Sequence, residues 1–189
     1  MNRIAVYCGS SAGVNGIYRD QAAQLGVLLA TRGIEVIFGG GKVGLMGFLA
    51  DAAMDNGGLV RGIIPEFLHV KEVAHDGLTE MITVDNMHER KKLIYNMSDA
   101  FIALPGGFGT LDELFEMLTW AQLGLHQKPV GILNVNGYYN SILKGITTMT
   151  EEGFLTIENR DMIQVSDRPE VLLSMMEQYQ APALPKWIK

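Results

Sequence analysis

Short apolar segments alternate along the chain with longer segments in which apolar residues recur at helical spacing. The short segments predict strands, and most of them are apolar on both faces. They cover residues 4–8, 34–38, 60–64, 100–104, 130–134 and 163–165. The longer segments predict helices of ordinary length. They cover residues 18–32, 45–56, 86–97, 111–123, 139–152 and 169–179.

This alternation predicts an α/β fold in which residues 1–189 form a single domain. We expect a doubly wound, mostly parallel, Rossmann-like sheet with helices on both faces, because strands that are apolar on both sides need cover on both sides. Ligands of such sheets bind beyond the carboxyl ends of the strands. Region 66–83 has no regular pattern and is expected to form a mobile flap over the site.

Charge and cysteine content narrow the class of protein. The chain carries 15 Lys and Arg against 21 Asp and Glu, a formal charge of −6 that disfavours nucleic acid as a partner. Cys8 is the only cysteine, so no disulfide forms within the chain and a reducing compartment is expected. The sequence has no signal-peptide pattern and no apolar run of about 20 residues. We therefore expect a cytoplasmic protein that does not bind membranes.

Three predicted strands end in glycine-rich loops, at residues 9–13, 39–47 and 105–113. The second loop contains Gly39-x-Gly41-x-x-Gly44, which matches the dinucleotide-binding fingerprint but follows the second strand rather than the first. Close packing of helix on strand explains these glycines equally well. Lys42 is followed by Val43, so the P-loop pattern of NTPases is not met.

The third loop, Gly106-Gly107-Phe108-Gly109-Thr110, has the form of an anion-binding turn. Glycines between a strand and a helix let backbone N–H groups turn toward a phosphate, and the helix dipole adds to the attraction. A tight turn with Thr110 as helix N-cap is the alternative. We expect Phe108 to be a packing residue.

Two charged groups near predicted helix starts are candidate site residues. Arg90 and Lys91 lie close to a helix N-terminus, where the dipole disfavours cations, so a compensating anion is expected. Glu113 follows the third loop by one turn. It could complete a capping box with Thr110, or stand beside a ribose and act as carboxylates do in glycoside hydrolysis.

The histidines do not form a metal-binding pattern. They lack the spacings typical of zinc sites, and Cys8 has no partner cysteine. We therefore expect no metal, and we interpret Cys8 as a small core residue at a strand end.

Taken together, the motifs resemble the LOG ("lonely guy") family of cytokinin riboside 5′-monophosphate phosphoribohydrolases, long mislabelled as lysine decarboxylases. The resemblance runs in order along nearly the whole chain. It is carried by the segments GGGKVGLMG (39–47), MHERK (87–91), PGGFGTLDE (105–113), TWAQLG (119–124), KPVG (128–131) and NGYYN (136–140).

The resemblance implies a homodimer without a cofactor that splits a nucleoside 5′-monophosphate of the adenine type into free base and ribose 5-phosphate. AMP and N6-modified cytokinin nucleotides are both expected substrates. Arg90 and Glu113 correspond to the catalytic pair. The positions that correspond to substrate-binding residues are Glu66, Lys91, Gly106, Gly107, Phe108, Gly109, Thr110, Leu111, Asp112 and Thr119.

Two alternatives remain at this point. Molybdenum-cofactor carrier proteins are similar in fold, have a glycine-rich phosphate loop and bind without catalysis. An NAD(P)-dependent oxidoreductase is supported only by the fingerprint at Gly39. The lysine decarboxylase label has little support, because no lysine stands in a recognisable pyridoxal-phosphate context.

Overall fold

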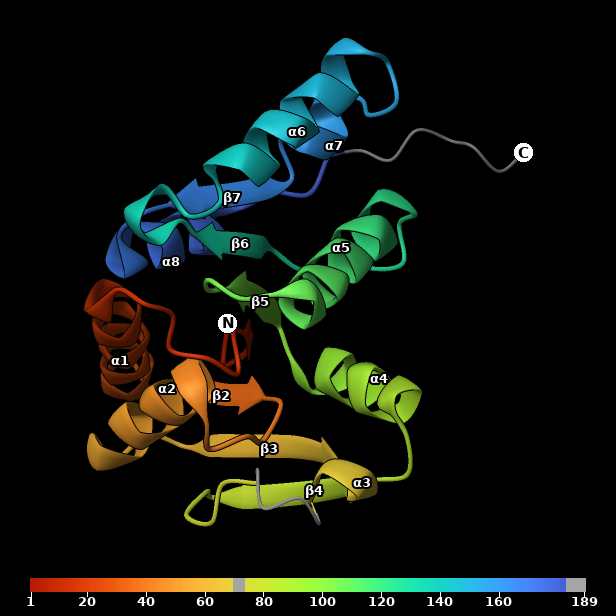
Figure 1. Cartoon of the computed structure of the whole chain (residues 1–189). Helices are drawn as coiled ribbons and strands as arrows, with labels where there is room; N and C mark the ends of the chain where they lie inside the picture. The colour runs from red at the N-terminus through yellow and green to blue at the C-terminus, as the bar shows by residue number, and fades with distance from the viewer. Residues whose placement is uncertain (70–73, 183–189) are drawn as a thin grey trace.

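The computed structural model describes residues 1–69 and 74–182 (Figure 1). Seven strands form one sheet in the order β4-β3-β2-β1-β5-β6-β7, and every neighbouring pair is parallel. The strands are β1 (Arg3–Tyr7), β2 (Glu35–Phe38), β3 (Val60–Pro65), β4 (Glu80–Val84), β5 (Ala100–Ala103), β6 (Val130–Leu133) and β7 (Ile163–Ser166). The prediction of a doubly wound Rossmann-like sheet is confirmed, and the sheet is parallel throughout.

Helices cover both faces of the sheet, as Figure 1 shows. One face packs against α1 (Gly16–Thr31), α2 (Gly44–Asp55) and α8 (Pro169–Gln178). The other packs against α4 (Met87–Met97), α5 (Phe108–Gln122) and α6 (Asn140–Glu151). The shorter elements are α3 (Glu66–Leu68), the 3-10 turn η2 (Val135–Gly137) and α7 (Ile157–Arg160). None of the described helices is long and apolar enough to cross a membrane.

The six predicted strands and the six predicted long helices are all present, and most of their ends agree within two residues. The largest difference is at α5, which begins at Phe108, three residues before the predicted start. The apolar periodicity predicts a start at Leu111, the first apolar residue of the helical face, but the helix already begins inside the glycine loop, at Phe108.

The expectation of an irregular flap at 66–83 is wrong at both of its ends. Residues 66–68 form α3, and β4 pairs in register with β3, for example Ile63 beside Ile82. β4 is one of the two edge strands, and none of its residues is fully buried. Thr83 interrupts its apolar residues, so it has no continuous apolar run for a sequence pattern to detect. Residues 70–73 of the expected flap lie outside the described residues.

The path of the chain creates a switch point in the sheet. From β1 the chain moves outward through β2 and β3 to β4, then returns to place β5 on the other side of β1. The loops after β1 and β5 therefore diverge to opposite faces and leave a crevice between them.

Candidate active site in the switch-point cleft

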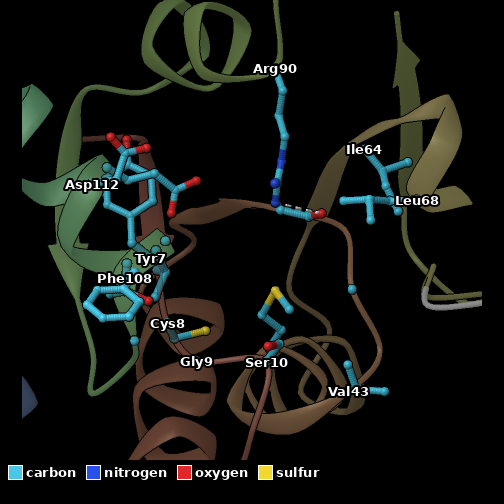
Figure 2. Close-up of a pocket in the computed structure, with 18 of the residues that line it drawn as sticks. Tyr7, Cys8, Gly9, Ser10, Val43, Ile64, Leu68, Arg90, Phe108 and Asp112 are labelled. Atoms are coloured by element: carbon cyan, nitrogen blue, oxygen red, sulfur yellow. Dashed lines mark hydrogen bonds between the residues drawn. The ribbon is translucent and has the colours of Figure 1, made fainter. Parts of the chain in front are cut away.

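A cleft of about 540 Å³ lies at this switch point, and Figure 2 shows the residues around it. The ends of β1, β2, β3 and β5 contribute to it, together with the first turns of α2, α4 and α5. The described residues that line it are Val6, Tyr7, Cys8, Gly9, Ser10, Gly39, Gly41, Val43, Met46, Ile64, Leu68, Met87, Arg90, Gly107, Phe108, Gly109, Thr110, Asp112 and Glu113. The cleft thus has apolar walls and a few polar groups, as small-molecule sites do.

The start of α5 presents unpaired backbone N–H groups to the cleft. Gly107 is the N-cap residue and offers no side chain, and the first N–H groups of any helix have no partner within it. Thr110 is therefore inside the first turn and buried, so the alternative in which it caps the helix is wrong. This arrangement can bind an anion through backbone donors and the helix dipole.

Close approach explains the glycine at position 106. A Cβ atom at Gly106 would collide with the Thr110 hydroxyl, so the turn closes only with glycine there. Gly106 itself lies beside a neighbouring groove, described below, whereas Gly107 lines both spaces.

Glu113 stands on α5 and is turned into the cleft. It is the sixth residue of the helix, so the capping-box interpretation is wrong. Burial raises the pKa of its carboxyl to about 7, although the Arg90 guanidinium opposes the shift; Asp112 adds to it. A carboxyl with a pKa near neutrality suits proton transfer or charge stabilisation at physiological pH.

Arg90 reaches into the cleft from α4, toward the end of β2 (Figure 2). Its Nε donates to the Ile63 carbonyl over 3.0 Å, and one terminal nitrogen donates to the Gly39 carbonyl over 3.1 Å. Strand-end carbonyls thus hold the guanidinium, and the Glu113 carboxyl is close enough to interact with its charge. A Cβ atom at Gly39 would occupy the place of the guanidinium, which explains the glycine at that strand end.

Lys91 lies on the outer side of the site. Its ammonium is 3.1 Å from carboxylate oxygens of both Asp112 and Glu116, so it joins α4 to α5. Burial lowers the pKa of Lys91, but the hydrogen bonds to Glu116 and Asp112 outweigh that effect and raise it overall. Here the compensating anions are protein carboxylates.

Phe108 is the most exposed aromatic residue of the site. Its side chain is 93% exposed and lies at the mouth of the cleft, so the prediction that it packs in the protein is wrong. An exposed ring beside a polar cleft can stack on a planar ligand.

Other predicted site residues lie away from the cleft. Glu66 is exposed on α3, and Thr119 is exposed farther along α5, where its hydroxyl donates to the Phe115 carbonyl. Leu111 is half-buried and packs against the core on the side of α4 and α5. None of these three, nor Lys91, is among the described residues that line the cleft.

The structure adds a group of residues at the end of β1 that the sequence did not single out as site residues. Tyr7 and Cys8 lie beneath Glu113, and Ser10 follows them in the glycine loop. Burial raises the pKa of both the Tyr7 hydroxyl and the Cys8 thiol, and Glu113 reinforces the shift. Cys8 is thus a thiol packed at the edge of the core, as expected for a structural cysteine. The glycine loop at 9–13 was the available signal for this group.

Known proteins are similar to this chain in sequence. Residues 46–176 match the protein family described as "Possible lysine decarboxylase". The chain is 49% identical over 177 residues to a "probable cytokinin riboside 5′-monophosphate phosphoribohydrolase" of Oryza sativa subsp. japonica, a match that covers 94% of this chain and 79% of that protein. A cytokinin riboside 5′-monophosphate phosphoribohydrolase of Arabidopsis thaliana is 48% identical, with 94% of this chain and 82% of that protein covered. The chain belongs to the LOG family.

Solved structures share the LOG fold at lower identity. The molybdenum cofactor binding protein from Rippkaea orientalis superposes with a TM-score of 0.71 at 23% identity, over 93% of this chain and 95% of that one. The Moco carrier protein from Chlamydomonas reinhardtii gives a TM-score of 0.69 at 20% identity, with the same coverage of both chains. These similarities concern the fold alone.

The residues of the cleft also bear on the lysine decarboxylase label, on metal binding and on the dinucleotide-binding fingerprint. A pyridoxal-phosphate decarboxylase needs a lysine for its Schiff base, and none of the described residues that line the cleft is a lysine. In the described part of the chain, no three His, Cys, Asp or Glu side chains are grouped so that they could hold a metal ion. Gly39 and Gly41 of the fingerprint line the cleft. Gly44 allows close packing instead, because a Cβ atom there would collide with the Ser10 backbone.

Proposed function

We propose that this LOG-family protein hydrolyses the N-glycosidic bond of adenine-type nucleoside 5′-monophosphates, releasing free base and ribose 5-phosphate. One observation carries the proposal: the half-buried Glu113 carboxyl shares a cleft with the Arg90 guanidinium and the unpaired N–H groups at the start of α5. A phosphate site next to a carboxylate is the arrangement that cleavage at the ribose of a nucleotide requires. The activity for which relatives at 48–49% identity are named supports the same reaction.

In the proposed mechanism, the 5′-phosphate binds at the first turn of α5, where Gly107, Gly109 and Thr110 offer backbone donors. The ribose then lies over Glu113, one turn farther into the helix. As the bond from the anomeric carbon to the base breaks, positive charge develops on the ribose, and the Glu113 carboxylate stabilises it and orients the attacking water.

Arg90 acts on the other side of the substrate. Two of its nitrogens are held by backbone carbonyls, and the third lies 3.7 Å from the Met87 sulfur, a weak acceptor. This third nitrogen retains a proton for the substrate. It anchors the nucleotide or stabilises negative charge on the departing base. The step balances because water gives its hydroxyl to the anomeric carbon and its proton to the departing base.

The wall made by Val43, Met46, Ile64, Leu68 and Met87 is apolar and faces the space left for the base. This wall accommodates adenine and an N6 substituent by the hydrophobic effect. Phe108 lies free at the mouth and stacks on the base or closes over it.

We also propose that the protein works without a cofactor, as a cytoplasmic homodimer. Cys8 as the only cysteine is consistent with a reducing compartment. The net charge of −6 disfavours nucleic acid as a partner, so the substrate is a free nucleotide. Sedimentation equilibrium measures the mass of the assembly; a monomer at micromolar concentration contradicts the homodimer.

The deciding experiment incubates the purified protein with AMP, isopentenyladenine riboside 5′-monophosphate and the two matching nucleosides, and measures the free base by chromatography. We expect free base from the monophosphates and little from the nucleosides, because the nucleosides lack the 5′-phosphate that binds at the start of α5. The ratio of the two monophosphate rates identifies the preferred base. A folded protein that releases no base from any of them contradicts the proposal, and tight binding of a molybdopterin would then favour the carrier alternative.

A further inference from the structure

The glycine loop before α5 is held by groups outside it. Three consecutive carbonyl oxygens accept hydrogen bonds: Leu104 from the Tyr139 hydroxyl at 2.6 Å, Pro105 from the Gly9 N–H at 3.0 Å, and Gly106 from the Tyr138 hydroxyl at 2.6 Å. A loop that binds an anion must keep its carbonyl oxygens away from the ligand, because their partial negative charge repels it. Of these three bonds, only the one from Tyr138 holds the carbonyl whose peptide continues into Gly107, the first residue of the loop that lines the cleft.

The hydrogen bond from the Tyr138 hydroxyl to the Gly106 carbonyl also sets the direction of the Gly107 N–H. In a trans peptide the C=O of one residue and the N–H of the next point to opposite sides. The Gly106 carbonyl lies beside a groove of about 290 Å³ on the Tyr138 side, whereas Gly107 also borders the cleft that contains Glu113. Holding the Gly106 carbonyl on one side therefore directs the Gly107 N–H to the other, and none of the described residues accepts a hydrogen bond from that N–H.

A tight turn after β6 positions Tyr138 and Tyr139. Asn136 and Gly137 both have positive φ, 52° and 69°, and reverse the chain after β6. The Asn134 side chain accepts from the Tyr139 N–H over 2.8 Å and fixes the turn. Tyr139 is fully buried, while Tyr138 is 44% exposed and its ring packs edge-on against Tyr18 at 5.8 Å.

We propose that Tyr138 is a positioning residue for the reaction: its hydroxyl, through the Gly106 carbonyl, holds the Gly107 N–H toward the 5′-phosphate of the substrate. The inference rests on the proposed function for the identity of that phosphate. The geometry itself requires only an anion at the start of α5.

Tyr139 supplies a matched control. Its hydroxyl makes a bond of the same length, but the peptide that follows Leu104 leads to Pro105, which has no N–H to direct. Removing this buried hydroxyl lowers stability without removing a phosphate donor. Tyr18→Phe is a second control, because it keeps the ring against Tyr138 and removes a hydroxyl that takes no part in holding the loop.

The experiment titrates wild type, Tyr138→Phe, Tyr139→Phe and Tyr18→Phe with ribose 5-phosphate and with ribose by calorimetry, and records the melting temperature of each. We expect Tyr138→Phe to raise the dissociation constant for ribose 5-phosphate roughly 10-fold, the loss of one well-aligned donor to a charged group. Its melting temperature should stay near that of wild type, since Tyr138 is 44% exposed. Steady-state assays with AMP should show a higher KM with kcat within about 2-fold.

The controls keep the two proposals separate. Tyr139→Phe and Tyr18→Phe are expected to bind ribose 5-phosphate within about 2-fold of wild type. Unchanged binding by Tyr138→Phe, an equal loss in either control, or no binding of ribose 5-phosphate by wild type overturns the inference. If wild type releases no base from nucleotides but Tyr138→Phe still weakens ribose 5-phosphate binding, the hydrolase proposal fails and the positioning role stands.

Discussion

Glu113 and Arg90 obtain their properties from opposite surroundings. Arg90 is held by two strand-end carbonyls, which fix the guanidinium. Glu113 is largely removed from solvent, and no described residue donates a hydrogen bond to it. Burial therefore raises the pKa of Glu113 to about 7. The ionised carboxyl costs free energy in the folded state, so Glu113 does not stabilise the fold.

Replacement of Glu113 by glutamine tests both aspects. We expect Glu113→Gln to lower kcat by about 100-fold or more, because the amide cannot stabilise positive charge on the ribose. The folded-state pKa is raised, so stability that is full at acidic pH is lost as pH rises through about 7. The variant should therefore be more stable than wild type at pH 8, by about 3 kcal/mol, and close to it at pH 4, below the unfolded-state pKa of the carboxyl. Urea denaturation at both pH values measures this; equal stability at pH 8 would show that the carboxyl is not desolvated.

Lys91 tunes the same carboxyl from outside the cleft. It neutralises Asp112 and Glu116, and its own charge lowers the pKa of Glu113. Lys91→Gln should therefore move the inflection of the pH–rate profile near 7 to higher pH, with the exposed Lys92→Gln as the matched control. Binding of phosphate by Lys91, as the family resemblance implies, would instead raise KM for the nucleotide and leave the inflection in place.

At the scale of elements, the site depends on how closely α4 approaches the end of β2. Gly39 leaves the space that the Arg90 guanidinium fills. We expect Gly39→Ala to displace Arg90 and to lower kcat/KM for AMP by about 10-fold or more, since a displacement of about 1 Å in a positioned group has large effects on rate. Circular dichroism and the assay for free base measure fold and activity; full activity would mean that Arg90 is not needed in this position.

Gly145 is the matching glycine away from the site. It lies within α6, and a Cβ atom there would meet nothing within 4 Å. Gly145→Ala should stabilise the protein by about 0.5–1 kcal/mol, because alanine loses less backbone entropy in a helix, and should leave activity unchanged. Thermal unfolding measures the change; a lower melting temperature would contradict the open space at this position.

The elements show what a sequence pattern can and cannot reveal. Buried strands such as β1 and β5 are continuous apolar runs, so their positions could be predicted within one residue. The edge strand β4 has no such run and was missed. In the site, the loops and the pair Arg90 and Glu113 could be identified from motifs, but the partners of Lys91 could not. Ion pairs between α4 and α5 depend on tertiary packing, which periodicity does not encode.

At the scale of the whole molecule, a ligand that binds only the folded cleft must stabilise the fold. Ribose 5-phosphate at 100 times its dissociation constant should add about 2.7 kcal/mol to the free energy of unfolding and raise the melting temperature. Ribose without phosphate should add little, because it cannot use the donors at the start of α5. Thermal shift measurements with both sugars test this, and equal shifts would place the phosphate elsewhere.

The switch point also determines when activity can arise during folding. Tyr7, Arg90 and Glu113 belong to segments that lie far apart in the sequence and meet only after β5 has been inserted beside β1. Parallel pairing of distant strands is slow, because loop-closure entropy is lost before the contacts form. In a refolding experiment, helical signal should therefore return first, and catalytic activity should return only with the last kinetic phase, when the two halves of the sheet have joined.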